Sequence, residues 1–116
     1  MPTVLRGDVF MANLEPVEDS EQGGTRPVVI VSRDAINNSS SVVVIASITD
    51  AANKKRIYPS HVQVTAGTGG LSINSIVVCE QIRAISKTRL KRSLGKFERA
   101  IMTRIDAALK ITLDLP

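Results

Sequence analysis

Short apolar runs dominate the first three quarters of the chain. From residue 8 to about 85 they alternate with polar, glycine-bearing loops, and no segment of helical length between them shows amphipathic spacing. Such a pattern is typical of β-strands. The expected strands are Val9–Leu14, Val28–Ser32, Val42–Ile48, His61–Val64, Ile73–Cys79 and Ile82–Ala84. Strands this short favour a small barrel or a curled antiparallel sheet.

The composition of the strands predicts their place in the sheet. Val28–Val31 and Val42–Ile45 contain no polar residue, which indicates that both faces of these strands are covered and that they lie centrally. His61–Val64 alternates between polar and apolar residues, which is typical of a half-exposed strand. The loops over residues 15–26 and 50–60 are long for a small domain, and loops of this length are often functional.

After Ala84 the apolar spacing changes to three and four residues. Ser86 is expected to begin a short helical turn, and Ser93 is expected to cap a second helix. The helix is defined by residues that recur at helical spacing: Phe97, Ile101, Ile105, Ala108, Leu109 and Thr112. It is expected to cover one face of the sheet. The sequence therefore predicts an α+β protein, strands first and helices last, with residues 1–116 in a single domain.

Charge and scarce residue types restrict the chemistry. Fifteen lysines and arginines against 11 acids give a net charge of +4, which suits an anionic partner but is also compatible with solubility alone. Cys79 and His61 are single residues of their types, so neither an internal disulfide nor a Cys/His zinc site is expected. The N-terminus lacks a secretion signal, and no apolar run approaches the ~18 residues of a membrane helix. A cytoplasmic location without membrane contact is expected.

Three common catalytic devices find little support. Four acids lie at strand ends or in loops where they could converge on a cation: Asp8, Glu21, Asp50 and Glu80. Their spacing does not require a metal, and no metal site is predicted. Ser–His–Asp catalysis would depend on His61, but no serine occupies a G-x-S-x-G elbow. The glycines at 67–70 lack the lysine and helix of a phosphate-binding loop, so a flexible connection is expected there.

The segment EQGGTRP at 21–27 carries a more specific signal. Adjacent glycines give the backbone freedom, and Pro27 then holds Arg26 extended. A guanidinium fixed there presents a planar fork of donors that matches a phosphate bidentately. If the strand that ends near Thr49 lies beside the strand after Pro27, the threonine hydroxyl could emerge at the same sheet edge. The alternative is a mobile loop from which Arg26 points into solvent.

Four blocks of the sequence resemble one known family. They are RGDVF at 6–10, SEQGGTRPVVIVS at 20–32, VVVIASIT at 42–49 and VVCEQIRAISKTRL at 77–90. In their order and spacing they resemble the MazF/PemK family of bacterial toxin mRNA interferases, over nearly the whole chain. The resemblance implies a small SH3-like antiparallel β-barrel of the CcdB/PemK type with a C-terminal helix. It also implies a homodimer, and an antitoxin protein that neutralises it by occupying the RNA groove.

The resemblance further implies an activity. Family members cleave single-stranded RNA at short sequences without a metal or other cofactor, and the ribose 2′-hydroxyl attacks the adjacent phosphorus to leave a 2′,3′-cyclic phosphate and a 5′-hydroxyl. The family's catalytic arginine matches Arg26, and its threonine at the end of the third strand matches Thr49. Because a guanidinium is a poor base near neutrality, Arg26 is expected to stabilise charge on the phosphorane. Glu21 is a candidate for the base.

Family positions that line the RNA groove match Ser20, Glu21, Gln22, Gly24, Gln81 and Arg83. Val17 stands where some relatives carry an aromatic ring, so base stacking is expected to contribute less than in most single-strand binders. Lys54, Lys55 and Arg56 offer attraction for an RNA backbone, or simply form a solvated basic loop. Two other functions remain open: a non-enzymatic toxin of the same fold that poisons a protein target such as gyrase, and an interaction barrel that binds an acidic peptide.

Overall fold

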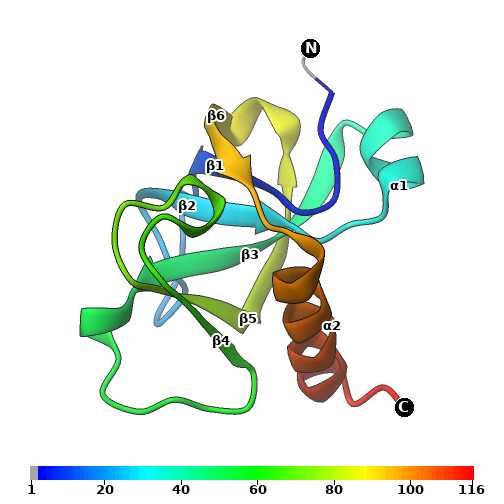
Figure 1. Ribbon diagram of the computed structural model, residues 1–116. Helices are drawn as coiled ribbons and strands as arrows, with labels where there is room; N and C mark the ends of the chain where they lie inside the picture. The colour runs from blue at the N-terminus through cyan, green and yellow to red at the C-terminus, as the bar shows by residue number, and fades with distance from the viewer. Residues whose placement is uncertain (1–2) are drawn as a thin grey trace.

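The computed structural model describes residues 3–116 (Figure 1). Its elements are β1 (Asp8–Asn13), β2 (Thr25–Ile30), α1 (Asp34–Ser39), β3 (Val42–Asp50), η1 (Ala51–Asn53), β4 (His61–Val64), η2 (Thr68–Gly70), β5 (Ser75–Ser86), η3 (Lys87–Arg89), β6 (Leu90–Lys96) and α2 (Arg99–Leu113). The strands form one antiparallel sheet in the order β4-β5-β3-β2-β1-β6. Over residues 3–116 the edge strands β4 and β6 do not pair, so the sheet curls without closing into the full barrel. The predicted α+β class is confirmed.

Alternate strand residues pack into two apolar clusters. Val9, Val29 and Ala46 belong to one cluster, and Phe10, Val28, Ile30 and Ile45 on the same strands belong to the other. The central strands β2 and β3 contribute fully buried side chains to both clusters, as their continuous apolar runs predicted. The C-terminal helix α2 packs against β4 and β5 and adds Ile105 and Ala108 to the first cluster (Figure 1). No helix within residues 3–116 has the length and apolar character needed to span a membrane.

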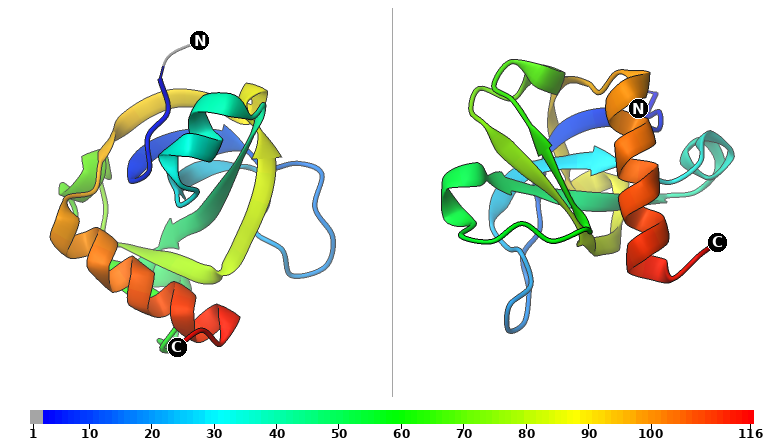
Figure 2. Two further views of the ribbon diagram at one scale, coloured as in Figure 1. Left: turned by 90° about the vertical axis from the view of Figure 1, so that its right-hand side faces the viewer. Right: turned by 60° about the horizontal axis from the view of Figure 1, so that its bottom comes forward.

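A bulge bends β5 in its middle. The pair Ala46↔Ile82 is followed directly by Ser47↔Val78, so residues 79–81 are extra on β5 and face no partner in β3. Because extra residues in one strand increase local twist, the strand changes direction here (Figure 2). The strands predicted at 73–79 and 82–84 are therefore the two halves of one bent strand.

The segment before α2 corrects one prediction. Ser86 does begin a turn, η3, and its hydroxyl oxygen accepts a hydrogen bond from the Thr88 amide at 3.3 Å. Residues 90–96, however, form the strand β6 along the edge of β1, and Ser93 lies opposite Phe10 instead of capping a helix. The helix α2 begins at Arg99. Pairing with β1 satisfies backbone groups that an open edge would leave unpaired, and this outweighs the local helical tendency.

A second departure is the short helix α1, which the sequence pattern did not predict. It is only six residues long and has no apolar period. Its buried Asn37 explains its position, because the side-chain amide donates to the Ser32 carbonyl at 2.9 Å and the amide oxygen accepts from the Ser32 hydroxyl at 2.5 Å. These bonds fix the connection between the two central strands.

The glycines at 67–70 connect two strands, as expected, but form a packed turn in place of the flexible loop that was predicted. Gly70 has a φ of +81°, and a Cβ atom there would lie 1.9 Å from the carbonyl oxygen of Leu94 in β6. At Gly69 a Cβ atom would lie 2.5 Å from the Phe97 ring. Glycine is thus required by the close approach of η2 to β6. This contact forms one wall of the site described next.

Candidate active site

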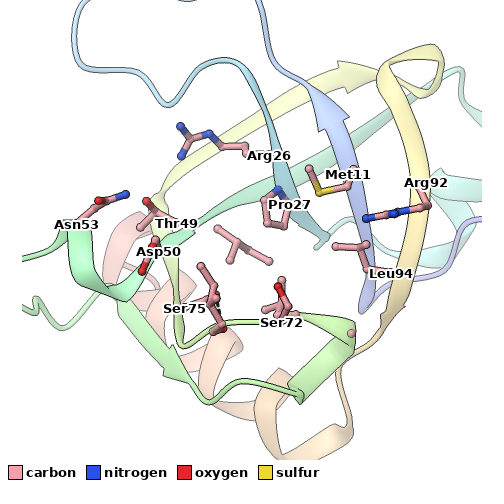
Figure 3. Close-up of a pocket in the computed structure, with 14 residues that line it drawn as sticks. Met11, Arg26, Pro27, Thr49, Asp50, Asn53, Ser72, Ser75, Arg92 and Leu94 are labelled. Carbon is pink, nitrogen blue, oxygen red and sulfur yellow. Dashed lines mark hydrogen bonds between the residues drawn. The ribbon is translucent and has the colours of Figure 1, made fainter.

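A pocket of about 490 Å³ opens where the ends of β2 and β3 face β6 and the segment between η2 and β5 (Figure 3). Its apolar lining includes Met11, Pro27, Ile48, Leu71, Ile73 and Leu94. Its polar lining includes Arg26, Thr49, Asp50, Asn53, Ser72 and Arg92. An apolar floor with a few converging polar groups, in this range of volumes, is typical of a ligand site.

The register of β2 and β3 brings Arg26 and Thr49 together. The last pair of this ladder is Val28↔Ser47, so Arg26 and Thr49 each lie two residues beyond it, at the same edge of the sheet. Both residues line the same pocket, with Arg26 on the side of Thr49 and Asn53 (Figure 3). The two side chains therefore line one pocket at one edge of the sheet, where the sequence predicted them.

Contacts with the preceding loop orient the Arg26 guanidinium. Its Nε donates to the Gly23 carbonyl at 2.7 Å, and its Nη1 donates to the side-chain oxygen of Gln22. A guanidinium has five N–H donors, so these bonds leave three that make no hydrogen bond within residues 3–116. Arg26 is half-buried and held by the loop, in contrast to the solvent-pointing alternative. It can still donate to an anion in the pocket.

Thr49 of β3 presents a hydroxyl to the same pocket. The residue is only 7% exposed, and its backbone is fixed by pairing with Ile76 of β5. No hydrogen bond joins its hydroxyl to another group of residues 3–116, although the residue lines the pocket. The next residue, Asp50, accepts a hydrogen bond from the Ala52 amide at 2.9 Å and so starts the turn η1, which brings Asn53 to the rim.

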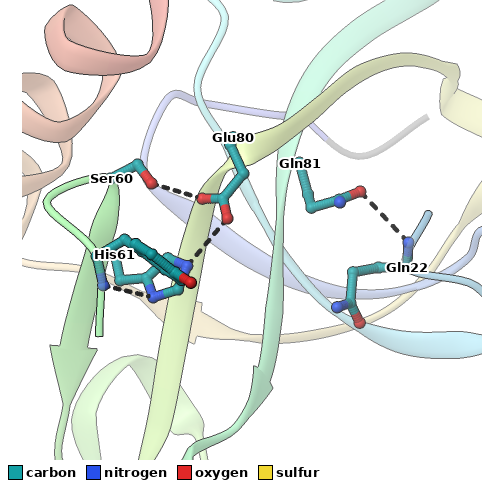
Figure 4. Close-up of polar contacts among 6 residues, drawn as sticks. Gln22, Ser60, His61, Glu80 and Gln81 are labelled. Atoms are coloured by element: carbon teal, nitrogen blue, oxygen red, sulfur yellow. Dashed lines mark hydrogen bonds and ion pairs between the residues drawn. The ribbon is translucent and has the colours of Figure 1, made fainter. Parts of the chain in front are cut away.

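Four of the predicted RNA-binding residues lie at the base of the loop between β1 and β2. The Gln22 amide donates to the Gln81 side-chain oxygen at 3.3 Å (Figure 4). The Arg83 Nη1 donates to the carbonyl of Leu14 at 2.9 Å. Gly24 has a φ of +72°, and its amide donates to the Glu15 carboxylate at 3.0 Å. The bulge in β5 thus supports the loop that holds Arg26.

The other two predicted binding residues, Ser20 and Glu21, are exposed. None of the six predicted RNA-binding residues lines the pocket itself. The Glu21 carboxylate accepts a hydrogen bond from the Glu18 amide at 2.5 Å, within the loop itself. The structure therefore does not bring this candidate base to Arg26. Over residues 3–116, no three His, Cys, Asp or Glu side chains gather closely enough to hold one metal ion. In the basic loop, Lys55 and Arg56 are exposed beyond the rim residue Asn53.

His61 belongs to a separate cluster beside the bulge (Figure 4). Its Nδ1 accepts from the Tyr58 amide at 3.2 Å, so the ring proton lies on Nε2, which donates to Glu80 at 3.0 Å. The Ser60 hydroxyl donates to the other Glu80 oxygen at 2.7 Å, so serine and histidine do not contact each other as a catalytic pair would. The cluster ties the loop before β4 to the bend in β5.

Burial and hydrogen bonding set the titration of this cluster. Burial alone would raise the pKa of Glu80, but bonds from the Ser60 hydroxyl, the backbone and the His61 ring outweigh it and lower that pKa below its ordinary 4.5. The neighbouring Cys79 is buried, and burial together with the nearby Glu80 charge raises the pKa of its thiol to about 12. A thiol that stays protonated is a structural residue and not a nucleophile.

Several residues of the pocket were not predicted from the sequence, above all Arg92, Ser72 and Asn53. Arg92 was expected in a helical segment, although Gly95 argued against a helix starting at Ser93 because glycine disfavours helix interiors. Ser72 and Asn53 lie in connections with no repeating pattern. Their positions depend on how loops from distant parts of the chain meet, for which no local signal exists.

The fold and the pocket together define a small α+β protein with a curled antiparallel sheet and an arginine–threonine pocket at the ends of its central strands. The family model described as "PemK-like, MazF-like toxin of type II toxin-antitoxin system" matches residues 5–113. The chain therefore belongs to the PemK/MazF toxin family, as its sequence blocks predicted.

Individual relatives agree with this assignment. The chain is 45% identical over 112 residues to the endoribonuclease MazF of Staphylococcus epidermidis, covering 97% of this chain and 92% of that protein. An endoribonuclease solved in complex with its cognate antitoxin, from a mycobacterial species, superposes with a TM-score of 0.80 at 28% identity, covering 97% of this chain and 96% of that one. MazF from Deinococcus radiodurans superposes with a TM-score of 0.84 over 99% and 100% of the two chains; at 21% identity it supports the fold alone.

Proposed function

We propose that this protein is the endoribonuclease toxin of a type II toxin–antitoxin pair and cleaves single-stranded RNA in the Arg26–Thr49 pocket without a metal ion. The observation that carries the proposal is that these two side chains, from the neighbouring strands β2 and β3, line one pocket. The name of the S. epidermidis relative, an endoribonuclease at 45% identity, supports the reaction class.

The reaction proposed is an internal transesterification. The ribose 2′-oxygen forms a bond to the adjacent phosphorus while the bond from phosphorus to the 5′-oxygen breaks, which leaves a 2′,3′-cyclic phosphate and a 5′-hydroxyl. The pentacoordinate phosphorane carries more negative charge than the starting diester. Donors that are already oriented stabilise this charge without reorganisation, and such stabilisation is usually the largest contribution to catalysis. The remaining N–H groups of Arg26 are such donors, because its other two are fixed by the loop.

Thr49 and Arg26 divide the other roles. The Thr49 hydroxyl holds a second phosphate oxygen, and its nearly buried position limits the rotamers that it can adopt. Arg26 supplies a proton to the departing 5′-oxygen. For Glu21 to take the 2′-hydroxyl proton, the loop would have to close over the bound RNA and give up the bond to the Glu18 amide. Asp50 is the carboxylate that lines the pocket itself.

The loop between β1 and β2 is the proposed reader of bases. Gln22, Gly24, Gln81 and Arg83 surround its base, and Ser20 and Glu21 at its tip extend the surface. Amides and carboxylates can bond the edges of splayed bases. We further propose a homodimer and a cognate antitoxin as partners; the mycobacterial relative solved with its antitoxin supports the second.

One experiment separates this function from the gyrase-type and peptide-binding alternatives. Purified protein is incubated with a mixed-sequence RNA in excess EDTA, and the fragment ends are identified by mass spectrometry. The proposal predicts fragments that end in a 2′,3′-cyclic phosphate and begin with a 5′-hydroxyl, in yields that the chelator does not reduce. Intact RNA, or cleavage that EDTA abolishes, would contradict it.

A further inference from the structure

A second arginine, Arg92, lines the same pocket from the opposite side (Figure 3). It lies on β6, and Leu94 of the same strand also lines the pocket. The strand β1 separates β6 from β2, so the two backbones that carry Arg92 and Arg26 lie two strand spacings apart, about 10 Å. Two guanidinium groups therefore face one cavity from strands on either side of β1.

The surroundings of Arg92 distinguish it from most other arginines of the protein. Arg6 forms an ion pair with Asp106 at 2.6 Å, and Arg83 and Arg89 donate to backbone carbonyls. The exposed side chain of Arg92 makes no hydrogen bond or ion pair within residues 3–116. The structure thus gives Arg92 no internal partner that would account for its position at the pocket.

The floor between the two arginines is apolar. Met11 and Pro27 face each other across β1 and β2, and Leu94 continues this surface toward Arg92. A ribose or base can lie on such a surface, while the charged groups at the two ends bind what flanks it. Asp50 is the negative group in the lining, but it lies next to Thr49, at the other end of the pocket (Figure 3).

We propose that Arg92 binds the phosphate next to the scissile one on the same RNA strand, so that one nucleotide spans the pocket floor between the two arginines. This inference rests on the proposed function, because the second phosphate is defined by the first one at Arg26. A guanidinium suits this role, since its planar fork matches phosphate bidentately and its charge is permanent. Arg92 acts as a positioning residue that sets where the strand lies relative to Arg26 and Thr49.

The test compares Arg92→Gln with Lys91→Gln. Lys91 is the exposed neighbour on β6, it does not line the pocket, and its substitution removes the same charge. The probe is a short RNA that spans a cut site found in the EDTA assay, with a 2′-deoxy sugar at the cut so that it binds without reacting. Two further probes each carry a neutral methylphosphonate, one at the phosphate before the cut and one at the phosphate after it.

The expected result has three parts. Arg92→Gln weakens binding of the all-phosphate probe about tenfold, as for a lost charge-assisted contact, and lowers the salt dependence of binding by about 0.7 in log–log slope. One of the two methylphosphonates weakens binding to the wild type by a similar factor and has no further effect in Arg92→Gln. With cleavable RNA, KM rises while kcat stays within about threefold, since binding common to ground and transition state is lost.

Two results would overturn the inference while leaving the proposed function intact. One is equal affinity and salt slope for Arg92→Gln and Lys91→Gln, while the wild type cleaves RNA. The other is additivity: Arg92→Gln loses affinity, but each methylphosphonate weakens binding to Arg92→Gln as much as it weakens binding to the wild type. Such a result would place the contact of Arg92 away from these phosphates. A wild-type protein that neither binds nor cleaves the RNA would overturn the proposed function and this inference together.

Discussion

Replacing Thr49 with valine removes one hydroxyl and leaves the shape of the side chain nearly unchanged. The hydroxyl has no hydrogen-bond partner within residues 3–116, and the backbone remains paired with Ile76. The fold therefore loses no bond, and the free energy of unfolding should change by less than about 1 kcal/mol. Loss of one preorganised donor to a developing oxyanion typically costs about a hundredfold or more in rate. A hundredfold loss corresponds to about 2.7 kcal/mol of transition-state stabilisation.

Single-turnover cleavage of a defined RNA in EDTA measures this loss directly, because product release does not enter the rate. The matched control is Thr25→Val, which removes the same group from an exposed position on β2, one residue from Arg26 and outside the pocket lining. We expect the control to cleave at the wild-type rate and Thr49→Val to be at least about a hundredfold slower. A Thr49→Val rate within about threefold of the control would refute the role of this hydroxyl.

Two further predictions concern stability. Gly70→Ala should lower the free energy of unfolding by about 2–4 kcal/mol, because the new Cβ atom meets the Leu94 carbonyl at 1.9 Å at a φ of +81°; Gly67→Ala, at a φ of +92° with nothing within 4 Å, should cost only the backbone strain. Denaturant titration measures both, and equal losses would contradict the packing argument. Glu80 has a lowered pKa, so its charge stabilises the fold above pH 4.5 and this stabilisation is lost as the pH falls through the folded-state pKa. Glu80→Gln should therefore be less stable than the wild type at pH 7, by a difference that shrinks below pH 4.5; a difference independent of pH would be the contrary result.

The centre of the sheet and the placement of Arg26 and Thr49 at one edge of it follow from local sequence signals. Two fully apolar runs must lie side by side at the centre, and Pro27 and Thr49 mark where those runs end. Once the runs pair as antiparallel strands, their ends come together whatever the loops do. This is why two side chains 23 positions apart could be placed at one edge before any coordinates were known.

The far side of the pocket could not be predicted in the same way. Residues 90–96 are mostly polar, because an edge strand buries little, and their pattern fits a helical turn as well as a strand. Only the open edge of β1 decides between the two, and this is a tertiary effect. The bulge at residues 79–81 likewise depends on pairing with β3, so the support of Gln22 by Gln81 had no sequence signal of its own.

The central claim is that the Arg26 guanidinium stabilises charge on the reacting phosphorus. Its most direct test is the single-turnover rate of Arg26→Ala on RNA in EDTA, beside Arg33→Ala, an exposed arginine with no side-chain bond within residues 3–116. We predict a loss of about a thousandfold or more for Arg26→Ala, with folding retained in thermal melts and with Arg33→Ala at the wild-type rate. Cleavage by Arg26→Ala at a rate near that of Arg33→Ala would contradict the claim.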